Sequence, residues 1–383
     1  MKFSDWGGVN RVTPMVINFL RNNVFGSEFV LDTEKKLFSF RDGVNKKVKN
    51  NIDKSMLEID GDTELNSKLT ALMEEYVSNN GSITQHDMDL LNLFAQNYYQ
   101  KIPSVFPETL EGEGVWEKFG ISPSTFKPLY AKTFIRPDTD RRYSMVYLYK
   151  FDMDRLKLDF IPGNKDAENP VCTGEMNSNQ KKNSMWIFSG GFQYIHGYYG
   201  MKYLNNEVLP PREDAATLLF YSDGSYRITK WQESFKNDRN IYAYRQNEFM
   251  LVIDGQITPD INKMWGLTPK NVDPIYTVRS GLGFTKNNEM VFAFGDSLSA
   301  DTLAKAMIMA GVINGMHLDM NYFNVHLVNV KRTHRENGEL KLWTFNENKT
   351  LSFYKNIYTY PSPRDYFVIS AKDPAITGST YLE

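Results

Sequence analysis

The sequence predicts an α+β fold, in which a β-rich domain with a mixed sheet follows a small helical N-terminal module. In the first hundred residues apolar side chains recur at helical spacing, whereas from about Tyr130 they fall in short runs typical of strands. Proline and glycine punctuate residues 103–128, between the two patterns. We therefore expect a helical N-terminal module at residues 1–105 and a second domain at residues 106–383.

Three helices make up the expected N-terminal module. The first begins at the capping pair Thr13-Pro14 and ends at Gly26. The second spans about residues 63–78, where apolar side chains again repeat at helical spacing. The third opens at Thr84, with Asp87 three residues later. Together the second and third helices form a helical hairpin with an additional helix before it.

The second domain is expected to consist mainly of strands. Strand-like runs occur at residues 145–151, 156–161, 185–188, 217–221, 226–229, 249–253, 276–284, 290–294, 315–318, 325–330, 340–345 and 351–354. The first two runs are expected to form a hairpin, and Ser222-Asp223-Gly224 is expected to form the turn between the fourth and fifth. One helix interrupts the strands, roughly from Ala300 to Gly311, with an apolar face and a glycine stop.

Composition favours a folded globular protein. Of the 383 residues, 41% are hydrophobic and 23% are charged, which is unlike a disordered segment. The formal net charge of -2 gives no reason to expect nucleic acid or an anionic membrane as a partner. A single cysteine, Cys172, excludes an intrachain disulfide and a cysteine-cluster metal site. No metal or other cofactor is predicted, because the five histidines lack metal-binding spacing as well.

The sequence contains no run of apolar residues long enough for a transmembrane helix, and its N-terminus lacks the apolar core of a signal peptide. Two settings remain open from the residues alone. The protein is either cytoplasmic, or it is exported and a leader or anchor is missing from this sequence.

Polar residues at the ends of three apolar runs are candidates for chemistry. Arg279 lies within the run 275–284, where a buried guanidinium needs an anionic partner, either a protein carboxylate or a ligand phosphate. Asp296 follows the run 290–295, a position that equally suits a capping or turn aspartate. Asp319 ends the run 315–318, and Asn321 follows it closely. Carboxylates at strand ends are well placed for acid–base or nucleophilic work.

A glycine pair and a histidine mark a second candidate segment. Ser189-Gly190-Gly191 follows a strand, and paired glycines allow backbone N–H groups to approach a ligand closely, although tight turns use the same residues. His196 begins an aromatic loop with glycines at positions 197 and 200. That loop suits either a sugar-binding platform or ordinary packing.

Taken in order, these segments resemble the phosphodiester glycosidase family. The family pattern is an Asn-Gly-Gly-Phe loop, Arg-x-x-x-Gly before a strand, a strand ending in Asp-Gly, a helix, and a strand ending in Leu-Asp-Gly-Gly-Gly-Ser. This chain has Ser189-Gly190-Gly191-Phe192, Arg279 with Gly283, Asp296-Ser297, the helix from Ala300, and Leu318-Asp319-Met320-Asn321. Order and spacing match over roughly residues 130–370.

The resemblance implies a mixed α/β domain and hydrolysis of a sugar-1-phosphodiester at its anomeric C–O bond. Arg279 would hold the phosphate, Asp319 would act as nucleophile or base, and Asp296 would be the second carboxylate. The resemblance further implies a group of substrate-positioning residues, namely Asn321, Ser189, Gly190, Gly191 and His196. Family members are generally secretory or cell-envelope proteins, so a periplasmic or secreted location is expected.

The chain departs from the family pattern at three places. Ser189 replaces asparagine, Ser297 replaces glycine, and Met320-Asn321 replaces the glycine run. Loss of that run favours an alternative, a catalytically weak glycan-binding or envelope-assembly protein on the same fold. The expected partner is a phosphorylated sugar or glycan, and residues 1–105 offer a surface for an envelope protein.

Overall fold

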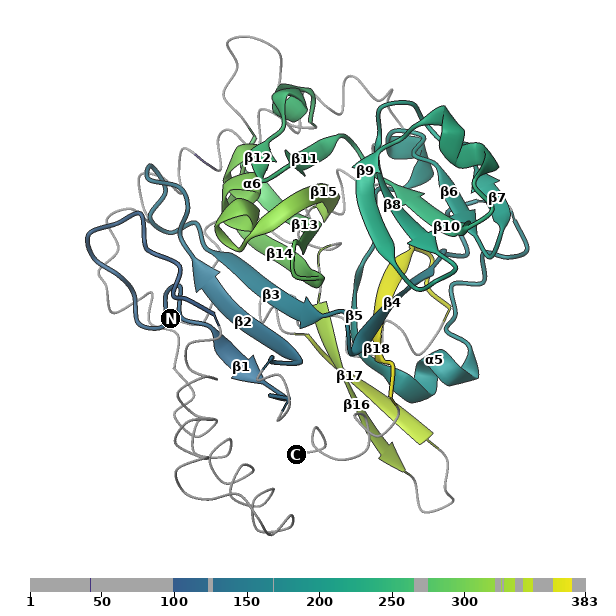
Figure 1. Cartoon of the computed structure of the whole chain (residues 1–383), viewed down its shortest axis with the longest axis horizontal. Coiled ribbons are helices and arrows are strands. Elements are labelled where there is room, and N and C mark those ends of the chain that lie inside the picture. Colours follow the sequence, from purple (N-terminus) through teal and green to yellow (C-terminus); the bar gives the residue numbers. More distant parts are fainter. Residues whose placement is uncertain are drawn as a thin grey trace.

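The computed structural model describes residues 42, 99–122, 127–167, 169–264, 275–320, 325, 327–334, 340–346 and 361–373. Most of the expected helical N-terminal module, the strand-like run 351–354 and Asn321 therefore lie outside the described residues. Strands dominate the part that is described (Figure 1). The β-rich character predicted from the sequence is thus confirmed.

An eight-stranded sheet forms one side of the domain. In spatial order it contains β1 (Glu117–Phe119), β2 (Tyr130–Ile135), β3 (Val146–Asp152), β14 (Glu289–Leu298), β13 (Thr277–Thr285), β15 (Val312–Met320), β11 (Met250–Ile253) and β12 (Gln256–Ile257). Its central strands β14, β13 and β15 carry three of the residues predicted to be functional.

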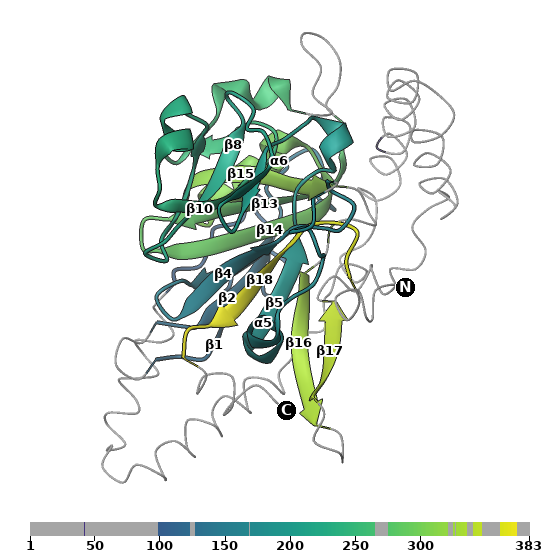
Figure 2. The same cartoon turned by 90° about the vertical axis from the view of Figure 1, so that its right-hand side faces the viewer.

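Two five-stranded sheets account for the other strands in the described part of the domain. One is ordered β17 (Leu340–Asn346), β16 (Leu327–His334), β5 (Ser184–Ser189), β18 (Tyr366–Ala371) and β4 (Leu156–Ile161). The other is ordered β7 (Asn206–Leu209), β6 (Met201–Tyr203), β10 (Ile241–Gln246), β8 (Ala216–Tyr221) and β9 (Tyr226–Lys230). Figure 2 shows β16 and β17 extending away from the rest of the domain as a two-stranded ribbon.

The strand pairing corrects two expectations. Every pairing among the described strands is antiparallel, whereas a mixed sheet was expected. The expected hairpin of runs 145–151 and 156–161 is also wrong, because β3 pairs with β2 and β14 while β4 pairs with β18. Apolar runs identify strands, but their partners depend on contacts distant in the sequence. The β8–β9 hairpin was predicted correctly, with Gly224 at φ +84° in its turn.

Among the described residues, the helices are few and short. Helix α6 (Ala300–Met309) is the one expected from the sequence; the Ser299 hydroxyl accepts a hydrogen bond from the Thr302 amide, and Gly311 follows with φ +89°. Helix α5 (Ser178–Asn183) was not predicted. The described part of the chain also has three 3-10 turns: η2 (Tyr194–His196), η3 (Glu233–Asn237) and η4 (Pro259–Lys263).

Aromatic side chains join the three sheets in one core. The Phe188 ring of β5 lies 4.6 Å from the Phe292 ring of β14 and 5.2 Å from the Phe367 ring of β18, centroid to centroid. Phe367 in turn stacks with Phe220 of β8 at 6.4 Å. Such pairs contribute about 0.5–1.5 kcal/mol each beyond the burial of their surface. The opposite face of β14, at Val291 and Ala293, packs against α6, so this strand is buried on both sides.

Candidate active site

Strand register brings three candidate residues to the same end of the eight-stranded sheet. Arg279 of β13 is paired with Gly295 of β14 on one side and with Met320 of β15 on the other. Asp296 and Asp319 are the direct neighbours of Gly295 and Met320. Adjacent strands lie about 4.8 Å apart, so the backbones that carry the two acids are separated by about 10 Å, with β13 between them.

Arg279 is a fully buried residue with partners inside the protein. Its Nε donates to the Leu298 carbonyl at 2.9 Å, its Nη2 donates to the Ile275 carbonyl at 3.1 Å, and its Nη1 lies 3.3 Å from His317 Nε2. Burial lowers the pKa of Arg279 to about 10, although the nearby Glu248 opposes that shift. The predicted phosphate-binding role is not supported, because a side chain with 0% exposure cannot reach a dissolved substrate in this conformation.

His317 continues this buried chain of polar groups. Because a guanidinium only donates, His317 Nε2 must accept, which leaves the proton on Nδ1. Nδ1 lies 3.5 Å from the Glu248 carboxylate. Burial and the adjacent Arg279 charge lower the pKa of His317 well below its usual value, so the ring is neutral. The histidine is therefore a hydrogen-bonded core residue.

Asp296 is half-buried and lies beside β3. The Ser297 hydroxyl is 3.4 Å from its carboxylate, and the Ser144 hydroxyl donates to its backbone carbonyl at 3.4 Å. Its charge also contributes to the raised pKa of Tyr143, whose main cause is burial. Ser297 adopts φ +60°, a left-handed conformation that glycine adopts more readily.

Asp319 lies at the end of β15, where the eight-stranded sheet meets the β5–β18 sheet. Its backbone amide donates to the Gly190 carbonyl at 2.9 Å, which ties the two sheets together. One carboxylate oxygen accepts a hydrogen bond from the Met320 amide at 2.8 Å, and the other accepts one from Arg364 Nη2 at 2.5 Å. The nearest cation of Asp319 is therefore Arg364, which precedes β18.

Arg364 belongs to a dense group of mostly buried charges, which we call the Asp319 cluster: Asp319, Arg364, Asp365, Arg245 and Asp166. Arg245 is fully buried, and its Nε donates to the Asp365 carboxylate at 2.9 Å. Asp166 adds a third acid, and burial together with the charge of Asp365 raises its pKa. Three carboxyl groups and two guanidinium groups thus lie in one cluster.

The glycine pair after β5 fits closely around this cluster. The Gly190 amide donates to the Asp365 carbonyl at 3.1 Å, and the Gly191 amide donates to the Asp365 carboxylate at 3.0 Å. A Cβ on Gly190 would lie 2.1 Å from that carboxylate, and one on Gly191 would lie 2.8 Å from Arg245. Both amide hydrogens are already bonded within the protein. The observed reason for the glycines is therefore close packing on Asp365.

Burial makes Asp319 a weaker acid than an aspartate in water. Desolvation raises its pKa to about 6; Arg364 and the Met320 amide lower it, and Asp365 raises it further. A carboxyl group of this kind exchanges a proton near neutral pH, as general acids and bases must. Arg364 keeps 24% of its side chain exposed, so it is the member of the pair that faces solvent.

Met320, the residue after Asp319, is packed inside the protein. It is 3% exposed and forms a small buried cluster with Phe192, Tyr199 and Ala215. Asp319 itself is 6% exposed, so little of this residue is open to solvent.

Two other predicted substrate-positioning residues are described, and neither is free of protein contacts. Ser189 is buried at the end of β5, and His196 is partly buried in η2, where its amide donates to the Gln193 carbonyl at 2.8 Å. The position of Asn321 lies outside the described residues.

Several residues of the site were missed by sequence reasoning. Arg245 begins a tetrad of consecutive buried polar residues, 245–248, which ends β10 and continues past it. Asn247 links two parts of the site, because it accepts from the Phe192 amide and donates to the His317 carbonyl, both at 2.9 Å. An uninterrupted polar tetrad after a strand was the available signal. Arg364-Asp365 before the apolar run 366–369 was another.

No group of three His, Cys, Asp or Glu side chains suited to a metal ion occurs among the described residues. In the same part of the chain, no helix has the length and apolar character needed to cross a membrane.

Comparison with known proteins finds distant resemblance only. No protein-family model matches the sequence, and no curated protein matches it. The zebrafish N-acetylglucosamine-1-phosphodiester alpha-N-acetylglucosaminidase catalytic domain, auto-inhibited by its pro-peptide, is 13% identical, with a TM-score of 0.41 over 67% of this chain and 87% of that chain.

Two other solved structures are less similar. A hypothetical protein from Synechocystis is 7% identical, with a TM-score of 0.34 over 63% of this chain and 62% of that chain. A protein described as exported, from Burkholderia pseudomallei, is 10% identical, with a TM-score of 0.35 over 59% and 74%. None of the three assigns a role to a residue of this chain.

Proposed function

We propose that the protein is a hydrolase that cleaves the glycosidic bond of a sugar-1-phosphodiester in a cell-envelope glycan or glycoconjugate. The observation that carries this proposal is the Asp319–Arg364 pair. It places a carboxyl group with a pKa of about 6 against a guanidinium that is partly exposed to solvent. The order of sequence segments that resembles the phosphodiester glycosidases gives the pair its chemical interpretation.

The proposed roles follow from charge. Phosphate is a good leaving group, so the reaction depends on neutralising its charge and on a carboxylate that faces the positive anomeric centre. Arg364 replaces Arg279 as the phosphate-holding residue, since within the described residues only its Nη2 donates hydrogen bonds. Asp319 acts as nucleophile, or as the base that takes the proton of the attacking water. The anomeric C–O bond breaks, and its electron pair leaves with the phosphate.

The experiment is a hydrolysis assay with UDP-N-acetylglucosamine and other sugar phosphodiesters, measured as free sugar released. Asp319→Asn keeps the shape of the side chain and removes its charge, so we expect a loss of about a thousandfold or more in turnover. Asp301→Asn is the matched control, because Asp301 is an exposed acid on α6 paired with Lys305. Near-normal turnover by Asp319→Asn would reject the assignment.

A second candidate function is a catalytically weak glycan-binding or envelope-assembly protein. The low exposure of Asp319 and the burial of Met320 favour it. Binding of a sugar phosphodiester without release of free sugar supports this alternative. Release that depends on Asp319 supports the hydrolase.

The cellular setting is part of the same proposal. A substrate in the cell envelope calls for a periplasmic or secreted protein. An envelope protein bound through residues 1–105 remains a prediction, because almost all of that module lies outside the described residues.

A further inference from the structure

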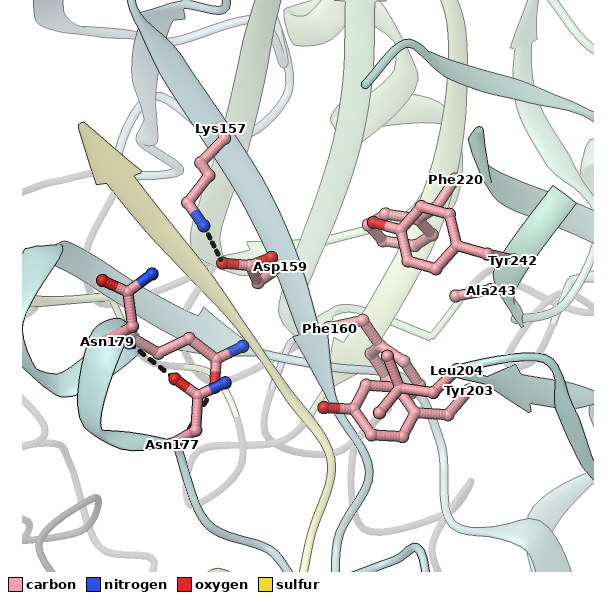
Figure 3. A pocket seen from close by; sticks show the side chains of 11 residues that line it. Lys157, Asp159, Phe160, Asn177, Asn179, Tyr203, Leu204, Phe220, Tyr242 and Ala243 are labelled. Carbon is pink, nitrogen blue, oxygen red and sulfur yellow. Dashed lines mark hydrogen bonds and ion pairs between the residues drawn. The ribbon is translucent and has the colours of Figure 1, made fainter. Parts of the chain in front are cut away.

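A separate cavity of about 180 Å³ lies beside the edge strand β4, between helix α5 and the sheet that contains β6, β8 and β10 (Figure 3). We call it the β4-edge cavity. None of its lining residues belongs to the Asp319 cluster. Its volume is below the roughly 300–1,000 Å³ of sites for drug-sized ligands, so it suits a single small ring.

Aromatic rings form one side of the β4-edge cavity. Tyr203 and Phe160 contact each other edge to face, with centroids 6.1 Å apart, and Tyr242 contacts Phe220 in the same manner at 6.3 Å. In Figure 3 these rings lie opposite the polar side chains of the cavity. Aromatic surfaces of this kind provide flat apolar contact area together with phenolic hydroxyl groups.

Side-chain amides and one ion pair form the polar side. The Asn177 side-chain oxygen accepts from the Gln180 amide, and the Gln180 side-chain oxygen accepts from the Asn177 amide, both at 2.9 Å. The Asn179 side-chain oxygen accepts from Asn183 at 2.8 Å. These bonds fix the three oxygens. The NH2 groups of Asn177, Asn179 and Gln180 donate no hydrogen bond within the described residues.

A charge-balanced ion pair lies on the same side. Lys157 Nζ lies 3.2 Å from an Asp159 carboxylate oxygen, and the Asp159 side chain is 20% exposed. Because the two charges offset each other, the pair gives a charged ligand no net attraction. A neutral ligand with several hydroxyl groups can donate to Asp159 and accept from the amides.

The backbone at the rim belongs to a tight hairpin turn. Leu204 adopts φ +48° and Asn205 φ +65° in the two-residue turn between β6 and β7, and the Leu204 side chain is 55% exposed beside the cavity. Positive φ at both residues is the geometry of such a turn. Leu158 of β4 bonds outward to the Tyr226 hydroxyl at 2.8 Å. The alternation of an antiparallel pair therefore points the backbone groups of Phe160 outward as well, toward the cavity.

We infer that the β4-edge cavity is a binding site for a neutral sugar ring, with Asp159 and the amides hydrogen-bonding its hydroxyl groups and Tyr203 and Tyr242 packing on its faces. The site lies apart from the Asp319 cluster and takes no part in bond cleavage. It would hold a sugar unit of a glycan whether or not the protein is a hydrolase.

The test is isothermal titration calorimetry of the full chain with glucose, galactose, mannose and N-acetylglucosamine. We expect at least one of these sugars to bind at a single site with a dissociation constant in the millimolar range. Asp159→Asn and Tyr242→Ala should each weaken binding about tenfold or more. Tyr242→Phe keeps the ring and should have a smaller effect, which guards against a folding defect in the alanine variant.

Two controls separate this site from the proposed active site. Asp301→Asn repeats the acid-to-amide change in an exposed ion pair on α6 and should leave binding unchanged. Asp319→Asn should also bind normally, even where it abolishes hydrolysis. The inference is overturned if none of the four sugars binds, if binding survives Asp159→Asn and Tyr242→Ala, or if binding is lost only in Asp319→Asn. Binding of choline instead would show an aromatic cage for cations and would equally overturn it.

Discussion

The Asp319 cluster and the β4-edge cavity both contain charged and polar side chains, but these side chains differ in how far they are exposed to solvent. In the cluster, Arg245 and Asp365 are buried and bonded to each other. In the cavity, the Lys157 and Asp159 side chains keep 33% and 20% of their surface exposed. Burial in the cluster raises the pKa of its carboxyl groups. Partial exposure in the cavity leaves hydrogen-bonding groups available to a ligand. Perturbed acidity therefore suggests chemistry in one region, and unused donors suggest recognition in the other.

The largest stability effect is expected from breaking the cluster. Arg245→Met leaves Asp365 as a buried charge without its partner, which costs about 3–5 kcal/mol of unfolding free energy. Urea denaturation measures the change. Arg142→Met is the matched control, because the Arg142 side chain is 48% exposed and should contribute about 0.5 kcal/mol or less. Equal losses of unfolding free energy in the two variants would contradict the claim that the buried charge matters more than the exposed one.

A pH dependence of about 3 kcal/mol is expected from Asp319. Its pKa is about 6 in the folded protein and about 3.9 in the unfolded chain. Between these values the folded state binds more protons at Asp319, so the contribution of Asp319 to stability is greatest below about pH 4 and declines as the pH rises to about 6. Denaturation midpoints across this range should fall less steeply in Asp319→Asn. Part of the slope should remain, because the pKa of Asp166 is raised as well. A slope unchanged by the substitution would contradict the burial of a titrating Asp319.

The smallest effect is expected from the cavity. Asp159→Asn removes one charge from a partly exposed ion pair, so the unfolding free energy should change by about 1 kcal/mol or less. The same variant should lose sugar binding, which separates recognition from stability. A loss as large as that of Arg245→Met would mean that Asp159 is a structural charge, like those of the cluster.

Local patterns in the sequence predicted the central strands and helix α6, but the expected runs did not include β1, β2, β6, β7, β10, β12 or β18. Strands β13, β14 and β15 are recognisable in the sequence as apolar runs, and α6 has both a capping serine and a terminating glycine. Helix α5 was missed because it is short and lacks an apolar stripe, although the Asn177–Gln180 capping box marks its start. Partners were harder, because the sequence alone does not show which strand lies beside which.

The candidate site was predicted only in part, because the sequence does not show which arginine lies beside Asp319. A buried guanidinium needs acceptors, and the sequence does not reveal whether a ligand or the protein supplies them. Arg279 is satisfied by two carbonyl groups and a histidine. Arg364 is the arginine that reaches Asp319, from 45 residues further along the chain. Only the meeting of β15 with the segment before β18 brings that pair together.

The tyrosine beside the edge of β4 has one more consequence. A single phenol there satisfies backbone groups that an edge strand otherwise leaves unpaired: the Tyr226 oxygen accepts from the Leu158 amide and donates to the Leu158 carbonyl. The Tyr226 ring also stacks on Phe284, with centroids 5.9 Å apart. A side chain of β9 thus closes the β4 edge from within the same molecule, and Tyr226→Phe would keep the ring while leaving the Leu158 amide and carbonyl without these bonds.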